Sequence, residues 1–308
     1  MILFQNKIIY MPSMPPFSRS EKISDYTRSC SPVIWEEKKI KSIDGTTITL
    51  CVGNMPARLD PAPPKHTAIL YFQGNGSSLP PRLPGLSSVL RALSNNSEHT
   101  YSIIALSYRG YWTSRGAPSE RGISMDAQSV IAYTLAQYPD STLILWGQSL
   151  GASVATTATA RYFSDLSHSS SLTEENAKVN PSQSRINALI LETPFLSIRS
   201  MLTELYPQRW LPYRYLHPFL WNHWESEAAL RIVSSTSRSK GIEAPRMLIL
   251  QAENDEVVPA MQSERLEEVG REVGLGVERK VVRGSLHTEV LVKAQGRAEV
   301  VRFLQENV

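Results

Sequence analysis

The 308-residue sequence predicts an α/β protein in which helices cover both faces of a mainly parallel sheet. Short apolar runs of strand length alternate along the chain with segments of helical periodicity, which is the pattern of such a sheet. One of these runs, residues 143–146, leads through a glycine-flanked serine into an Ala-rich helical segment. No internal repeat interrupts the pattern. We therefore expect residues 1–308 to form a single domain that carries one insertion.

The expected elements follow from local signals along the chain. Strands are short apolar runs bounded by Gly, Pro, Asn or Asp, and they are expected at residues 35–40, 46–52, 68–72, 101–107, 143–146, 188–191, 247–251 and 278–282. Helices are expected after the serine turn and where apolar residues recur at helical spacing, at residues 86–93, 124–138, 260–268 and 301–308. The beginning of the chain, residues 1–32, is rich in Pro and Ser and is expected to be an extended arm.

Two later segments interrupt this alternation. Residues 164–184 are polar and Ser-rich and are expected to form a mobile loop. Residues 197–240 are expected to form a cap-like insertion, which contains a dense aromatic stretch at 206–224. This stretch could line the site as an acyl-binding wall or lid, and it could equally be a self-packed excursion broken by prolines. In the first case Trp210 and Trp221 would contact an apolar acyl group.

Composition argues against several classes of function. The net charge is only +3 and the basic residues are scattered, so no nucleic-acid partner is expected. Cys30 and Cys51 lack metal-ligand spacing and are expected to be free thiols. The proposed chemistry needs neither a metal nor an organic cofactor, and we expect none. No apolar window is long enough to cross a bilayer, and residues 1–10 are too short for a secretory signal, so a soluble protein is expected.

The stretch Thr142–Ala160 carries the strongest functional signal. At its centre, Gly147-Gln148-Ser149-Leu150-Gly151 places G-x-S-x-G between a strand and a helix, which is the nucleophile elbow of α/β-hydrolases. The glycines on both sides of the serine permit a tight, strained turn. The hydroxyl then lies at a helix N-terminus, where a developing negative charge is favoured. Ser149 is therefore the predicted nucleophile.

A nucleophilic serine needs a base and an acid that orients the base. In α/β-hydrolases these partners follow the serine in the order Asp or Glu, then His. Of the six histidines, His287 is the one that lies just after the last expected strand and before a C-terminal helix. Asp255 follows the strand at 247–251, at the sheet edge where active sites of this class lie, and is the preferred acid. Glu192, at the end of the strand at 188–191, is the rival acid.

An oxyanion hole requires two backbone N–H groups aimed at one point. Leu150, directly after the nucleophile, is expected to supply the first. Asn75, in the loop after the strand at 68–72, is expected to supply the second, because Gly74 lets this backbone approach closely. The alternative is that this glycine-rich segment is merely a turn.

With these residues located, the chain resembles the α/β-hydrolase-domain family around the fungal bud-emergence hydrolases, whose animal members include lysophospholipid lipases and protein depalmitoylases. The segments that carry the resemblance are QNKIIYMPSMPP followed by Ser18-Arg19, YFQGNG, SYRGYWTSRGAPSERGISMDAQ, LWGQSLGASVA, LETPFLSI, AENDEVVP and GSLHTEV. The resemblance implies serine-hydrolase activity on acyl esters or thioesters, with Ser149, Asp255 and His287 as the triad. The expected partner is accordingly a small acyl-ester substrate or an acylated molecule.

The chain departs from this branch at two positions. Gln73 stands where a histidine usually precedes the oxyanion glycine, which predicts a changed loop contact and retained activity. Trp112 replaces a small residue and is expected to crowd the mouth of the pocket, where it would contact substrate. Relatives often carry an N-terminal membrane anchor just before the QNKIIY-like segment. Membrane association is therefore compatible with the resemblance, and the localisation stays open between cytoplasm and endomembranes.

Two further functional hypotheses are compatible with this fold. A serine peptidase would use the same triad order, although the sequence carries no substrate-filtering domain. A non-catalytic scaffold, for instance in cell-polarity control, would keep the fold for partner binding. The presence of all three triad candidates argues against the scaffold, because binding alone does not need them.

Overall fold

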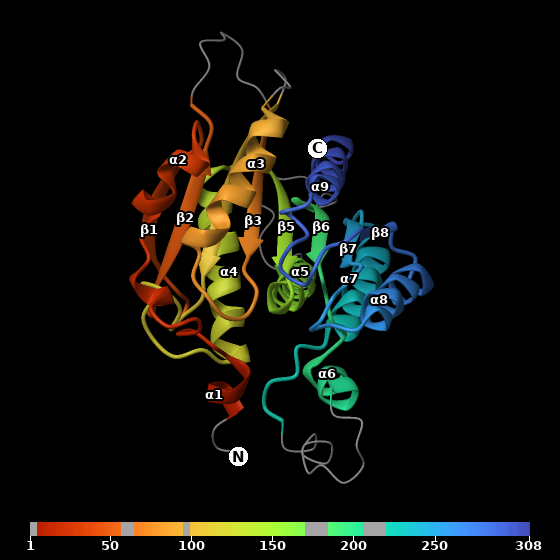
Figure 1. Cartoon of the computed structure of the whole chain (residues 1–308). Coiled ribbons are helices and arrows are strands. Elements are labelled where there is room, and N and C mark those ends of the chain that lie inside the picture. The colour runs from red at the N-terminus through yellow and green to blue at the C-terminus, as the bar shows by residue number, and fades with distance from the viewer. Residues whose placement is uncertain (1–4, 57–64, 95–98, 170–183, 206–219) are drawn as a thin grey trace.

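The computed structural model contains one eight-stranded sheet with the strand order β1-β2-β4-β3-β5-β6-β7-β8 (Figure 1). The structure describes residues 5–56, 65–94, 99–169, 184–205 and 220–308. The strands are β1 (Ile34–Lys41), β2 (Thr47–Asn54), β3 (Lys65–Phe72), β4 (His99–Ser107), β5 (Thr142–Gln148), β6 (Ile186–Glu192), β7 (Arg246–Ala252) and β8 (Val277–Val282). Strand β2 is antiparallel to both of its neighbours, and all the other pairs are parallel. The prediction of a mainly parallel sheet is confirmed.

Helices bury the apolar side chains of both sheet faces, as the sequence predicted. On one face, α3 (Leu83–Leu93) and α9 (Ala294–Glu306) pack against residues such as Ile69 and Trp146. On the other face lie α4 (Glu120–Gln137), α5 (Leu150–Ser169), α7 (Ser226–Lys240) and α8 (Ala260–Glu272), packed against residues such as Leu70 and Leu145. Successive strand residues point to opposite faces, so each central strand contributes to both cores.

Several element boundaries differ from the ranges expected from the sequence. Helix α4 begins four residues before the expected start, because the Ser119 hydroxyl caps it by accepting the N–H of Gly122 at 3.1 Å. Strands β3 and β4 begin before the expected strands at 68–72 and 101–107, so they include His66 and His99. Both histidines lie at the beginning of parallel strands, which is the sheet edge opposite to the one that carries the predicted triad.

The N-terminal segment is not simply an extended arm. It contains α1 (Gln5–Ile9), η2 (Ser18–Ser20), η3 (Ile23–Tyr26) and α2 (Thr27–Cys30). Tyr10, which follows α1, is buried, and its hydroxyl donates to Asn222 Oδ1 at 2.8 Å and accepts from Trp224 Nε1 at 3.0 Å. These contacts span more than two hundred residues of sequence, so local composition could not reveal them. The segment is part of the packed structure.

The two predicted interruptions are shorter than expected. Helix α5 extends to Ser169, so the first residues of the expected mobile loop are helical, and residues 170–183 lie outside the described residues. Within 197–240, α6 (Ile198–Leu205) begins an excursion from the sheet (Figure 1), but α7 packs beside α5 as an ordinary crossover helix between β6 and β7. Among the described residues of this range, only α6 and residues 220–225 depart from the regular alternation. Residues 206–219 lie outside the described residues.

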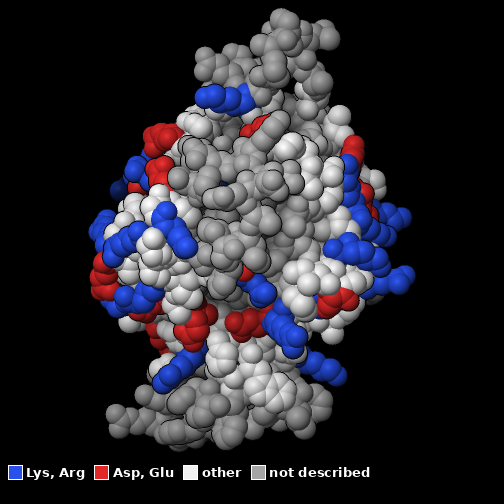
Figure 2. Space-filling view, turned by 180° about the vertical axis from the view of Figure 1, so that it is seen from behind, with Lys and Arg blue, Asp and Glu red and all other residues white. Residues whose placement is uncertain are grey.

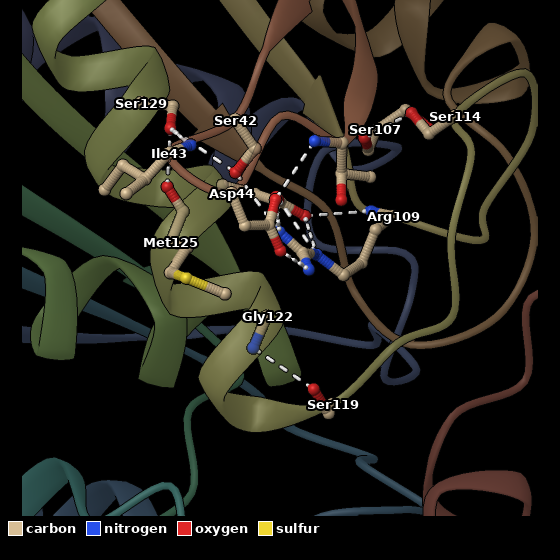
Figure 3. Close-up of polar contacts among 12 residues, drawn as sticks. Ser42, Ile43, Asp44, Ser107, Arg109, Ser114, Ser119, Gly122, Met125 and Ser129 are labelled. Carbon is tan, nitrogen blue, oxygen red and sulfur yellow. Dashed lines mark hydrogen bonds and ion pairs between the residues drawn. The ribbon is translucent and has the colours of Figure 1, made fainter.

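A buried ion cluster fixes the loop that follows β4. The guanidinium of Arg109 bonds both Asp126 of α4 and Asp44 of the β1–β2 turn, each with a shortest distance of 2.7 Å, and also contacts the Ser42 hydroxyl (Figure 3). Asp126 is fully buried and Arg109 nearly so. Gly122 is required here, because a Cβ at this position would lie 2.6 Å from Arg109 Cδ. The cluster joins the β1–β2 turn, the loop after β4 and the start of α4.

The surface that the structure describes carries charges of both signs. On the face seen in Figure 2, Lys and Arg side chains lie interspersed with Asp and Glu side chains along both flanks. Among the described helices, none combines the length and the apolar character needed to cross a bilayer. Cys30 and Cys51 are both buried free thiols.

Candidate active site

Ser149 lies in a strained turn between β5 and α5. Its φ of 51° is in the left-handed region, which costs a non-glycine residue about 1–3 kcal/mol and persists only where the surroundings enforce it. The Ser149 N–H donates to the Glu192 carbonyl oxygen at 2.8 Å, and the Ser149 carbonyl oxygen accepts from Ala152 at 2.9 Å. The side chain is half-buried at the first turn of α5. This geometry is that of a nucleophile elbow.

Both glycines of the pentapeptide are needed because backbone segments touch there. A Cβ at Gly147 would overlap the carbonyl oxygen of Gly151, and a Cβ at Gly151 would overlap the carbonyl oxygen of Phe72 at the end of β3. The turn therefore packs directly against the end of the neighbouring strand. The sequence predicted the glycines from the pattern, and the structure supplies the steric reason.

His287 and Asp255 form a hydrogen-bonded pair at the same edge of the sheet. The Nδ1 atom of His287 lies 2.9 Å from each carboxylate oxygen of Asp255, and both side chains are nearly buried. Because an ionised carboxylate only accepts hydrogen bonds, Nδ1 carries the proton and Nε2 is left as the basic nitrogen. Ser149, Asp255 and His287 follow the carboxyl ends of the parallel strands β5, β7 and β8, so the topology brings them to one edge.

The environment of Asp255 favours its ionised form. Burial on its own would raise the pKa of this carboxyl group. Three effects oppose burial: the hydrogen bond to His287, the positive charge of His287 when it is protonated, and the N–H groups of Val257 and Val258 at 2.9 and 2.7 Å. The net result is a pKa below the usual value for aspartate. Asp255 is thus suited to hold the imidazole in one tautomer and to stabilise its protonated form.

The acidic neighbours of Asp255 hold the histidine loop in place. Glu256 accepts the backbone N–H of His287 at 2.9 Å, and Glu253 accepts the N–H of Gly284 at 2.8 Å. The backbone N–H of Asn254 donates to Ser285 at 2.9 Å. No local sequence pattern predicted the contact between Glu256 and His287, because it joins two loops 31 residues apart.

The loop after β3 lies over the elbow. A Cβ at Gly74 would be 3.6 Å from the Ser149 Cβ, so this backbone passes close to the predicted nucleophile. The Asn75 side chain points to the N-terminal segment: its Oδ1 accepts from Met11 N at 3.0 Å and from the Tyr111 hydroxyl at 2.7 Å. The predicted oxyanion role of Asn75 and Leu150 concerns their backbone N–H groups, and it stays a prediction.

The three tryptophans predicted to contact substrate have different environments. Trp112 is buried, with its indole N–H donating to the Glu21 carbonyl oxygen at 2.8 Å. It packs in the apolar cluster on the α3 side of the sheet. Trp221 is 61% exposed and is attached through its backbone N–H to Gln5 at 2.9 Å. Trp210 lies outside the described residues. A substrate contact stays a prediction for all three residues.

Glu192, the rival acid, contacts a different partner. Its Oε1 accepts from Gln148 Nε2 at 3.0 Å, while His287 bonds Asp255. Burial raises the pKa of Glu192 from an ordinary 4.5 to about 7, although Arg82, Gln148 and His287 oppose the increase. The second carboxylate oxygen has no hydrogen-bond partner among the described residues, which further disfavours the ionised form.

This raised pKa predicts a pH-dependent stability. The folded protein holds the Glu192 proton more tightly than the unfolded chain, so the free energy of unfolding falls as pH rises from about 4.5 to about 7. Glu192→Gln removes this penalty. The free energy of unfolding of the variant, relative to that of wild type, should therefore increase by about 3 kcal/mol from pH 4.5 to pH 8. Urea denaturation at both pH values measures this change. Glu36→Gln, at an exposed strand position, is the control and should follow the wild-type pH dependence. Parallel curves for wild type and Glu192→Gln would contradict the prediction.

The fold and the strained serine turn define the class of protein. A parallel sheet whose central strand leads through G-x-S-x-G into a helix is the arrangement of α/β hydrolases. A family model described as alpha/beta hydrolase fold matches residues 67–222, just over half of the chain. The chain therefore belongs to the α/β hydrolase fold family. Within the described ranges, no group of three or more His, Cys, Asp or Glu side chains is arranged to hold a metal ion.

Similar proteins include bem46 of Schizosaccharomyces pombe, 29% identical over 65% of this chain and 55% of its own length. The WAV2 protein of Arabidopsis thaliana is 30% identical over 67% of the chain and 57% of its length. Lysophosphatidylserine lipase ABHD12 of Macaca fascicularis is 33% identical over 65% of the chain and 44% of its length. The chain thus spans about half the length of these relatives.

Solved structures show the same fold at low sequence identity. An α/β hydrolase from Vibrio vulnificus superimposes with a TM-score of 0.67 at 17% identity, covering 97% of this chain and 92% of that one. A fungal esterase from Rhizomucor miehei gives 0.61 at 15% identity, covering 98% and 90%.

Proposed function

We propose that the protein is a serine hydrolase that cleaves carboxylic acyl esters or thioesters through an acyl-enzyme on Ser149. The observation that carries the proposal is the Asp255–His287 pair at the sheet edge that also presents the strained Ser149. The matches to a lysophosphatidylserine lipase and to esterase folds support ester hydrolysis. Substrates of the lysophospholipid or acylated-protein type fit this class, and membrane association fits such substrates.

The mechanism follows from the proposed roles. His287 Nε2 removes the Ser149 proton as Oγ attacks the acyl carbonyl carbon, and Asp255 stabilises the imidazolium. The backbone N–H groups of Leu150 and Asn75 donate hydrogen bonds to the carbonyl oxygen and stabilise the negative charge that develops on it. The tetrahedral intermediate then expels the alcohol or thiol, which takes the proton from His287. Water, deprotonated by the same imidazole, attacks the acyl-enzyme and releases the acid and the free Ser149 hydroxyl.

Covalent labelling tests the proposal directly. A fluorophosphonate probe should label the native protein and leave Ser149→Ala unlabelled, because the phosphonyl group is captured by the activated hydroxyl. In-gel fluorescence measures the result, and Ser153→Ala, which changes another serine of α5, should label like the native protein. Absence of labelling in the native protein would contradict the proposal and favour a non-catalytic scaffold. If labelling occurs, a series of acyl esters of increasing chain length would define the acyl pocket.

A further inference from the structure

A row of three hydrogen-bonded side chains, those of Arg82, Gln148 and Glu192, lies next to the proposed nucleophile. Gln148 and Glu192 are cross-strand partners at the ends of β5 and β6, and Gln148 Nε2 donates to Glu192 Oε1 at 3.0 Å. From the other side, Arg82 of η4 (Pro80–Arg82) donates its Nη1–H to Gln148 Oε1. Gln148 and Glu192 are both buried. The Gln148 amide therefore uses its donor and its acceptor to link two elements that are distant in sequence.

Each end of this row of side chains belongs to a residue that contacts a part of the proposed catalytic machinery. The Glu192 backbone carbonyl accepts the Ser149 N–H at 2.8 Å, and Gln148 directly precedes the serine. Arg82 Nη2 donates to the carbonyl oxygen of Gly76 at 3.3 Å, in the loop that contains Asn75. The same loop passes so close to Gln148 that a Cβ at Gly74 would lie 3.2 Å from Gln148 Oε1.

We propose that Gln148 and Glu192 are positioning residues that, together with Arg82, hold the elbow and the loop after β3 in register. This inference rests on the proposed function. Gln148 sets the distance between the Ser149 hydroxyl and the expected oxyanion donors, because its side chain bonds the strand end on one side and the Arg82–Gly76 contact on the other. None of the three residues needs to touch substrate to act in this way.

The expected size of the effect follows from the geometry of catalysis. Acyl transfer requires the nucleophile and the oxyanion donors to fit one transition state, and a displacement of about 1 Å can lower the rate on the order of 10²-fold. Removal of the buried Gln148 amide would also leave Arg82 and Glu192 without their shared partner, so these two side chains would rearrange. The loss should fall on kcat and leave KM nearly unchanged, because transition-state contacts are affected more than substrate binding.

The test compares two buried glutamines near the carboxyl ends of parallel strands, Gln148 of β5 and Gln251 of β7. Gln148→Leu should lower kcat for p-nitrophenyl butyrate by about 30- to 100-fold, with KM changed less than about threefold. Gln251→Leu is the matched control: Gln251 is buried near the end of β7 and is bonded by Arg279 at 2.8 Å, but it has no contact with the elbow in the described structure. This control should keep kcat within about threefold of wild type.

Variants of Glu192 separate positioning from bulk stability. Glu192→Gln keeps the acceptor for Gln148 and should retain at least about half of kcat, whereas Glu192→Leu removes it and should resemble Gln148→Leu. The double variant Gln148→Leu/Glu192→Leu should be no slower than the worse single variant, since both break one linked unit. If Gln148→Leu does not fold, Arg82→Met at the partly exposed end should still lower kcat by about tenfold.

The outcomes distinguish this inference from the proposed function. A folded Gln148→Leu with kcat within about threefold of wild type, or a fully additive double variant, would overturn the positioning role while the wild type still hydrolyses ester and accepts the probe. A wild type that neither hydrolyses ester nor accepts the probe would refute the proposed function and this inference with it. Loss in Gln148→Leu and Glu192→Leu, with activity in Glu192→Gln and Gln251→Leu, would support the inference.

Discussion

His287→Ala should lower kcat for an activated ester by about four orders of magnitude, because the Ser149 proton then has no acceptor. Asp255→Asn should cause a loss of similar order. An amide can donate to the imidazole and thereby stabilise the wrong tautomer, in which Nε2 carries the proton. Steady-state kinetics with p-nitrophenyl esters measures both losses. The double variant should be little slower than His287→Ala alone, since the two residues act as one unit.

A matched histidine controls for non-specific effects. His66 also bonds hydroxyl groups, those of Ser141 and Ser102, but at the opposite edge of the sheet. His66→Gln should therefore keep kcat within about threefold of wild type. If His287→Ala retained a tenth or more of wild-type activity, the assignment of His287 as the base would be wrong.

The largest effect on stability is expected for Asp126→Ala. Asp126 is fully buried and accepts the Arg109 N–H groups on both carboxylate oxygens, at distances from 2.7 to 3.1 Å. Its removal leaves the buried guanidinium with Asp44, which is about one-third exposed, as its remaining carboxylate. Breaking a buried pair in this way costs about 3–5 kcal/mol, because the remaining charge stays out of water without compensation. Urea denaturation with linear extrapolation measures the loss.

An exposed ion pair provides the comparison. Glu272 pairs with Arg231 and Arg265 on the surface, where solvent screens the charges, so Glu272→Ala should leave the urea midpoint almost unchanged. Equal losses in the free energy of unfolding for Asp126→Ala and Glu272→Ala would show that burial does not determine how much the Arg109 cluster contributes to stability.

The sequence patterns that proved most informative were local. Strands β3 to β8 could be found because buried parallel strands are short apolar runs, and the elbow because its glycines and serine are contiguous. His287 and Asp255 could be selected because the carboxyl ends of parallel strands share an edge, so a residue just after a strand is confined to a small region. The structure places them 2.9 Å apart, as that reasoning requires.

Where prediction failed or was silent, the deciding contacts join residues far apart in the chain. Proline and serine content suggested an extended arm for residues 1–32, but burial of Tyr10 against Asn222 and Trp224 anchors the beginning of the segment to the core. No local pattern indicated that Trp112 packs in the apolar cluster on the α3 side of the sheet.

Contiguous residues thus sufficed to predict the α/β class, the order of the elements and the tight turn at Ser149, because strand burial and turn strain are properties of neighbouring positions. Only the tertiary structure decided the partners of Gln148, the burial of Glu192 and the contacts of Tyr10 with Asn222 and Trp224. Hydrogen bonds between distant segments are selected by packing, and no short window of sequence contains both partners.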